Sequence, residues 1–166
     1  LLLVVLDLIQ EKIIKTNKIV YDDVVKDRFT KYIKQYGHEG DRNRPYTPFF
    51  HLRSSGFWHL KAKPAREEIL KSLTSVGGPN ELIENVEYAY LSDSIYGFFT
   101  DKVASKKIKE EIIMLLWDYK NGKTRITAYK ANSLFLHEEK AIKKIESQAH
   151  HIGKFLNNVL IYDNQS

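Results

Sequence analysis

Basic side chains and aromatic rings occur together in residues 42–66, a combination that can bind nucleic acid. Cations neutralise phosphates and release their counterions, while rings stack against bases or sugars. The stretch "YTPFFHLRSSGFWHL", residues 46–60, contains five Phe, Tyr and Trp rings among basic residues. Some of these rings must belong to the core. The basic residues that we expect to contact phosphate are Arg42, Arg44, His51, Arg53, His59, Lys61, Lys63 and Arg66.

Histidines near the end of the sequence could suggest metal chemistry, but their spacing argues against it. His150 and His151 are adjacent, so on a helix their side chains point about 100° apart. Glu146 and His150 form a single i, i+4 pair, which is too common to indicate a metal site. The "AHHI" run is similar to the start of an HNH nuclease motif, but too few residues follow it for the metal finger. The chain has no P-loop, GxGxxG or GxSxG motif, so we predict no catalytic residue, no metal and no cofactor.

The composition is that of one globular domain of 166 residues. The 26 Lys and Arg outnumber the 21 Asp and Glu, and the net charge of +5 favours an acidic partner such as DNA. The absence of cysteine fits a reducing compartment, so we expect a cytoplasmic protein. No run approaches the roughly 18 apolar residues of a membrane span. The opening "LLLVVLDLI" is expected to be a buried helix, because it has neither a basic leader nor a cleavage site.

Helices should surround the basic and aromatic stretch. Residues 1–14 are apolar on nearly all sides, which predicts a central helix. A second helix should begin at Asp22 or Asp23 and end at Tyr36, with Gly37 as its C-terminal cap.

Further helices are predicted after the stretch. Pro64 should start a short helix that ends at the glycine pair 77–78. Ser92 and Ser105 are suited to cap two more helices, and the compact domain should end near Tyr119.

The runs "PFFHLR" and "GFWHLKA" predict a β-hairpin with its tight turn at Gly56, and "NVEYAYL" predicts a further strand. Alternation in this hairpin would place His51, Arg53 and His59 on one side. The predicted fold class is therefore α+β: a mainly helical domain with a small antiparallel β-hairpin or sheet and a C-terminal helix.

We expect residues 1–119 to form the DNA-recognition domain and residues 120–166 to form a connector and a last helix. Between Leu134 and Ile161, apolar residues follow the alternating three- and four-residue spacing of heptads. This helix either packs back on its own domain or forms a homodimer contact. The residues of that contact would be Ile142, Ile145, Ile152 and Leu156.

Taken together with "LLLVVLDLI", "VEYAYLSDSIYGFF" and "IKEEIIMLLW", the run "PFFHLRSSGFWHL" resembles the N-terminal sulfur-recognising domain of HNH restriction endonucleases of the ScoMcrA type. The resemblance extends over roughly residues 1–119. It implies binding to DNA in which sulfur replaces a non-bridging phosphate oxygen, through a small apolar pocket ringed by basic side chains. It also implies that cleavage belongs to a separate C-terminal HNH domain.

The resemblance adds Thr47 and Pro48 to the DNA-contact candidates and assigns a place to His51, and the adjacent Tyr46 is a further candidate. Pro48 falls on the proline of the family's pocket, and His51 falls on a residue that lines the same wall. Thr47 stands where that pocket has a tyrosine, while Tyr46 lies one place earlier.

Our hypothesis is a non-cutting module that recognises double-stranded DNA in a modification-dependent restriction system. The residue pattern fits phosphorothioated, methylated and unmodified DNA alike. The alternative is a protein-interaction or dimerisation module that uses the C-terminal helix and has no DNA specificity of its own.

Overall fold

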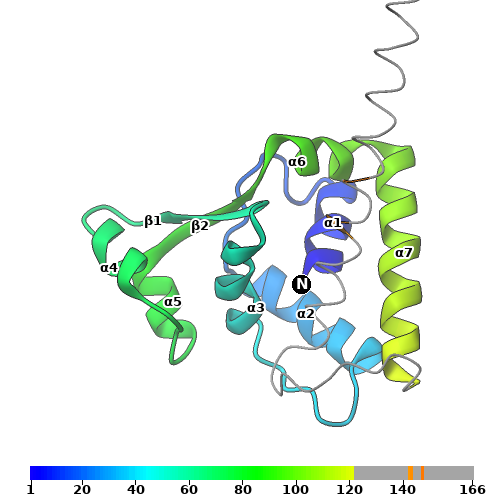
Figure 1. The fold of residues 1–166 in the computed structure, drawn as a ribbon, viewed down its shortest axis with the longest axis horizontal. Helices are drawn as coiled ribbons and strands as arrows, with labels where there is room; N and C mark the ends of the chain where they lie inside the picture. Colours follow the sequence, from blue (N-terminus) through cyan, green and yellow to red (C-terminus); the bar gives the residue numbers. More distant parts are fainter. Residues whose placement is uncertain (122–141, 144–146, 148–166) are drawn as a thin grey trace, which may run out of the picture.

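The computed structural model describes residues 1–121, 142, 143 and 147 (Figure 1). A buried helix, α1 (Leu2–Gln10), lies at the centre and packs against α2 (Asp23–Tyr36), α6 (Asp93–Thr100) and α7 (Lys102–Lys120). We call these four helices the bundle. The central helix is confirmed, but it ends at Gln10 because Lys12 has a left-handed backbone, with φ of 59°.

The predicted bounds of α2 are confirmed. The side chain of Asp22 accepts a hydrogen bond of 3.0 Å from the Val25 amide at the first turn. At the other end, the Gly37 amide donates to the Ile33 carbonyl at 2.8 Å. A Cβ at residue 37 would collide with that carbonyl oxygen, which explains the glycine.

The hairpin predicted for residues 48–62 is wrong in its first half. Residues Tyr46–His51 form a short helix, α3, and Leu52–Ser55 continue it as a 3₁₀ turn, η1. Pro45 precedes the helix with a helical φ of −61°, and Pro48 stands in the first turn, where its missing N–H has no helical partner. Aromatic residues favour strands, but six residues are too few for periodicity to reveal the helix.

The strand prediction is correct for β1 (Trp58–Ala62) and β2 (Val86–Leu91), which pair antiparallel with each other. Gly56, with φ of 87°, ends η1 and turns the chain into β1. Trp58 lies opposite Leu91, and a bulge interrupts the register between Lys61 and Ala62. The predicted α+β, mainly helical class is thereby confirmed for the described part of the chain.

Two short helices, α4 (Glu67–Ser72) and α5 (Pro79–Asn85), lie between the strands. The sequence predicts a single helix from Pro64, and this prediction misses α5, which starts with a proline directly after Gly78. We call β1, α4, α5 and β2, residues 58–91, the ribbon arm, which extends from the bundle to the left in Figure 1.

The two serine caps have different outcomes. Helix α6 follows Ser92 as predicted, although this serine makes no side-chain capping bond. Ser105 is not a cap: it lies buried inside α7. The cap is Asp101, whose carboxylate accepts the amides of Val103 and Ala104 at 3.0 and 2.7 Å. A carboxylate at the helix start satisfies two amides that have no intrahelical partner.

Most of the predicted last helix lies outside the described residues, including Ile145, Ile152 and Leu156. Ile142 is described, and it is completely buried in the same core cluster as the bundle residues. This burial agrees with the alternative in which the segment packs back on its own domain. Among the described residues, no helix is long and apolar enough to span a membrane.

Candidate nucleic-acid interface

The outer face of the ribbon arm presents rings to solvent. Trp58 and Ala62 of β1 are buried, while His59 and Lys61 alternate with them on the other side. His59 lies opposite Tyr90 of β2, and their rings stack with centroids 5.1 Å apart and planes 30° apart. Tyr88 is the next ring along the same face, with its centroid 6.3 Å from that of Tyr90. We call this face, formed by the rings of His59, Tyr88 and Tyr90, the aromatic platform.

Cations border this platform. The Lys18 ammonium lies 5.1 Å from the Tyr88 ring centroid, and Lys61 is opposite Tyr88 in the strand register. Lys63 and Arg66 follow β1 in the turn that leads to α4. Within the described part of the chain, Lys61, Lys63 and Arg66 make no ion pair, so their charges are available to phosphates.

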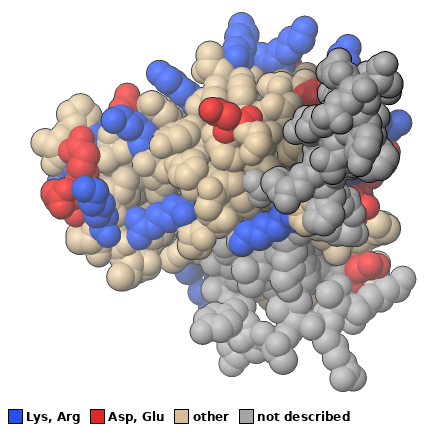
Figure 2. All heavy atoms as spheres, turned by 45° about the horizontal axis from the view of Figure 1, so that its top comes forward, with Lys and Arg blue, Asp and Glu red and all other residues tan. Residues whose placement is uncertain are grey.

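A groove of about 560 Å³ separates β1 from α4 and opens beside the platform. His59, Lys61 and Tyr90 form its strand side, and Lys71 lies on its helix side. Lys71 pairs with the exposed Glu68 at 2.8 Å, and this hydrogen bond raises the pKa of the ammonium group. Over the ribbon arm in Figure 2, Lys and Arg side chains lie beside a smaller acidic cluster. Side chains of both charge signs, including Lys61, Lys71 and Glu67, therefore line the groove and are accessible to solvent.

Arg53 has a structural task that the sequence did not reveal. Its guanidinium donates to the carbonyls of Leu70, at 2.9 Å, and Leu73, at the C-terminal end of α4. It also lies over the Phe50 ring, 4.0 Å from the centroid. Two of its donors are therefore engaged in fastening α4 to the α3 segment, which leaves fewer for a phosphate.

His51 is half-buried at the end of α3, and its ring meets Phe50 edge to face. Burial, followed by the positive charge of Arg53, lowers the pKa of the imidazole below its usual 6.5. The ring is therefore neutral at physiological pH. His51 can line an apolar surface or donate one N–H, but it does not supply a cation.

Thr47, Pro48 and His51 share one side of α3, since His51 follows the other two by four and three residues. Pro48 is buried, while Thr47 and Tyr46 are half-buried. Behind them, the buried Phe49 ring meets the Tyr21 and Trp58 rings edge to face, at centroid distances of 5.2 and 5.4 Å. The Trp58 indole donates to the Phe49 carbonyl at 2.9 Å, so α3 is closely packed against β1. We call the side of α3 formed by Thr47, Pro48 and His51 the α3 wall.

The basic candidates do not form one patch. Arg42 and Arg44 are located in the loop between α2 and α3, at the bottom of Figure 1. Lys63 and Arg66 lie where β1 leads into α4, at the left end of the same view. The α3 wall and β1 lie between these two groups along the chain. A ligand that reached all of them would have to be extended, as a nucleic-acid strand is.

The sequence-based site prediction missed Lys18, Lys71, Tyr88 and Tyr90. The two tyrosines carry a local signal, because their i, i+2 spacing in "VEYAYL" puts both rings on one face of a strand. The lysines carry none, since only the folded chain brings them to the platform. Among the described residues, no group of three His, Cys, Asp or Glu side chains could hold a metal ion.

Comparison with known proteins shows that more than half of the chain, including α3 and the ribbon arm, matches a protein family. Residues 14–109 match the family described as "ScoMcrA-like, DNA sulfur-binding domain". No curated protein matches the chain.

Proposed function

Because the chain belongs to the ScoMcrA-like DNA sulfur-binding domain family, we propose that it recognises phosphorothioated double-stranded DNA for an HNH-type, modification-dependent restriction system. The observation that carries the proposal is the family match over residues 14–109, which includes every DNA-contact candidate from Arg42 to Arg66. The aromatic platform with its bordering cations supports the same conclusion.

The phosphorothioate would lie against the α3 wall formed by Thr47, Pro48 and His51. Sulfur is larger and less well hydrated than oxygen, so burying it against apolar atoms is favourable. The Pro48 ring, the Thr47 methyl group and a neutral His51 imidazole suit that role. Because His51 is uncharged, the charge of the phosphate must be met elsewhere. The arginines of the preceding loop, Arg42 and Arg44, are the nearest candidates along the chain.

The platform would hold the same DNA at a second place. Lys61, Lys63 and Arg66 would contact phosphates, while His59 and Tyr90 would pack against the sugar edge. Phosphate contacts position a protein on DNA but carry no sequence information of their own. In this arrangement affinity comes from the ribbon arm, and discrimination of sulfur from oxygen comes from α3.

We further propose that residues 1–119 form the recognition unit and that residues 120–166 are an appended element, with Ile142 packed into the core. Cutting would be carried out by a separate nuclease domain or partner. Access to DNA and the lack of cysteine fit a cytoplasmic location.

The decisive experiment compares the binding of the 166-residue chain to two matched duplexes, one of which contains a single phosphorothioate, across a salt series. We expect tighter binding to the sulfur-containing duplex, and affinity for both should fall as salt rises. Equal affinity would remove the sulfur assignment. Binding that is absent at every salt concentration would remove the DNA assignment.

Thr47→Tyr provides a gain-of-function arm, because it restores the tyrosine that the family's pocket has before its proline. The added ring should increase the ratio of affinities for the two duplexes and leave the salt dependence unchanged. Tyr46→Phe serves as the neighbouring control, since it alters a ring one position away and should leave the ratio as it was.

A further inference from the structure

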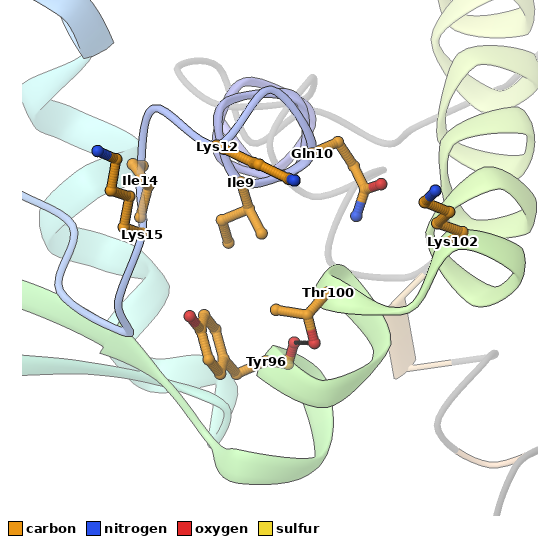
Figure 3. Close-up of a pocket in the computed structure, with 8 residues that line it drawn as sticks. All are labelled: Ile9, Gln10, Lys12, Ile14, Lys15, Tyr96, Thr100 and Lys102. Carbon is orange, nitrogen blue, oxygen red and sulfur yellow. Dashed lines mark hydrogen bonds between the residues drawn. The ribbon is translucent and has the colours of Figure 1, made fainter.

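A second hollow, of about 360 Å³, lies on the bundle and is separate from the α3 wall and the platform (Figure 3). Ile9, at the end of α1, and Ile14, in the turn after it, lie on one side of the hollow, and Tyr96 of α6 lies on the other. These three residues form an apolar floor. Pockets of about 300–1,000 Å³ are the size that takes small molecules. The floor is anchored to the core, since Ile9 is buried there.

Amino groups stand at the rim. Lys12 and Lys102 approach the hollow from opposite sides, with the Gln10 side chain between them (Figure 3). Lys15 also belongs to the lining, but its ammonium group is turned outward. Thr100 uses its hydroxyl to bond the carbonyls of Tyr96 and Gly97, at 3.2 and 3.0 Å, so it completes the wall without offering a donor.

The backbone around Lys12 holds it in this place. The Lys12 amide donates to the Ile9 carbonyl at 3.0 Å, and the Ile13 and Ile14 amides both donate to the Leu8 carbonyl, at 2.9 and 3.1 Å. Lys12 itself has the left-handed φ of 59°, which aims the chain back across the end of α1. The turn that carries one wall of the hollow is therefore tied to the buried helix.

The charged side chains among the described residues that line the hollow are all lysines, namely Lys12, Lys15 and Lys102. None of the described residues that line it is acidic. The nearest carboxylate in sequence to Lys102, that of Asp101, accepts the first amides of α7. Lys12 and Lys102 both place positive charge at the rim, and a bound anion would reduce the repulsion between like charges. An apolar floor beneath such a pair favours an anion that also carries a flat or apolar part.

We propose that this hollow binds a nucleotide phosphate between Lys12 and Lys102, with the base or sugar lying on Ile9, Ile14 and Tyr96. The phosphate belongs either to a free mononucleotide or to a DNA strand that crosses the bundle. The two sources share one chemistry, and the experiment below separates them. This site goes beyond the proposed function, because it uses no residue of the α3 wall or of the platform.

The first test titrates the 166-residue chain with deoxyadenosine 5′-monophosphate and follows the backbone amides by NMR. The amides of residues 96–102 and of 10–15 should shift together in a saturable way. Inorganic phosphate and deoxyadenosine, each lacking one half of the ligand, should both bind more weakly. The absence of a saturable shift at millimolar nucleotide would overturn the proposal, as would phosphate binding equal to that of the nucleotide.

Lys12→Gln with Lys102→Gln should weaken nucleotide binding about tenfold, since two charge-assisted hydrogen bonds to the phosphate are removed. The matched control is Lys34→Gln with Lys107→Gln, which removes the same charge from exposed lysines outside the hollow. Equal weakening by both pairs would reduce the effect to net charge and overturn the site.

The source of the phosphate follows from competition with unmodified duplex DNA. If the duplex displaces the nucleotide and the Lys12–Lys102 double variant also weakens duplex binding, the site belongs to the DNA strand. If duplex and nucleotide bind independently, the ligand is a free nucleotide. Either result supports the hollow as a phosphate site, and neither changes the outcome of the phosphorothioate comparison.

Discussion

The carboxylates of Asp7 and Glu11 at the bundle are paired within the protein, whereas several lysines of the ribbon arm have no such partner among the described residues. In the bundle, the buried Asp7 carboxylate accepts a hydrogen bond from Tyr32 and pairs with Lys109 at 2.7 Å. Nearby, Arg28 holds Glu11 through two bonds of 2.7 and 2.6 Å. In the ribbon arm, Lys61 and Lys63 have no such partner among the described residues.

The contrast has a physical reason. A carboxylate inside a core must be paired, because burying an unpaired charge is very costly. Burial, followed by the bond to Asp7, also raises the pKa of the Tyr32 hydroxyl to about 12, so Tyr32 remains a donor at all ordinary pH values. Exposed lysines carry no such cost and retain their charge for a ligand. The bundle therefore pairs its buried Asp7 carboxylate for stability, and Lys61 and Lys63 of the ribbon arm keep their charge for binding.

Asp7→Ala removes the buried carboxylate of the bundle and should have the largest effect on stability. It leaves the Tyr32 hydroxyl without its acceptor and Lys109 without its partner, and we expect the free energy of unfolding to fall by about 3 kcal/mol. Urea denaturation measures this decrease. The control is Glu110→Ala on the exposed side of α7, which should change stability by less than about 0.5 kcal/mol. Equal decreases would contradict the structural role of Asp7.

Arg53→Met tests the junction of the two regions. The carbonyls of Leu70 and Leu73 would be deprived of a charged donor, and the unfolding free energy should fall by about 2 kcal/mol. The slope of DNA affinity against salt should stay nearly the same, because Arg53 is engaged within the protein. A protein of unchanged stability with a smaller salt slope would show that Arg53 contacts phosphate instead.

Lys61→Gln with Lys63→Gln tests the ribbon side. Stability should change by less than about 0.5 kcal/mol, because neither side chain has an ion-pair partner among the described residues. The slope of log affinity against log salt should become shallower by about 2, close to one for each phosphate that is no longer neutralised. The Lys34→Gln and Lys107→Gln control should leave the slope unchanged, since those lysines lie on the bundle.

His51 should produce the smallest effect, seen in the pH dependence of stability. Its folded pKa lies below the unfolded value of about 6.5, so the unfolded chain binds the proton more tightly. The contribution of His51 is therefore fully present above pH values of about 6.5 and disappears as the pH falls through the folded pKa. His51→Gln should flatten this part of the curve in urea denaturation between roughly pH 7.5 and 5. If the parent protein instead became more stable on acidification while His51→Gln did not, the pKa of His51 would be raised in the folded state and not lowered.

The prediction of this fold from sequence succeeded where the signals are local. The Asp22 cap and the Gly37 terminus of α2 depend on neighbouring residues, and the apolar first segment is buried in any compact arrangement. The strands were recognised from alternation, but the partner of β1 was not. The prolines at 45 and 48 are compatible with the start of a helix, but they do not require one. The packing of the Phe49 ring against Tyr21 and Trp58 accompanies the helical conformation of α3.

The residues of the candidate site lie on α3, η1, β1 and the connecting loops, and their contact with DNA stays a prediction. Sequence position alone treated Arg53 and Lys61 as equivalent cations. The structure distinguishes them, because the guanidinium of Arg53 bonds carbonyls 17 and 20 residues later in the chain.

The amino-acid sequence by itself determined the helical α+β class, the buried first helix, the capped ends of α2 and the family, because caps, periodicity and motifs are encoded within short windows. Only the tertiary structure decided that β1 pairs with β2, that Tyr90 stacks on His59, and that burial lowers the pKa of His51. It alone brought Lys12 and Lys102 to opposite sides of one hollow. These features depend on contacts between segments distant in the chain, and such contacts exist only once the core has formed.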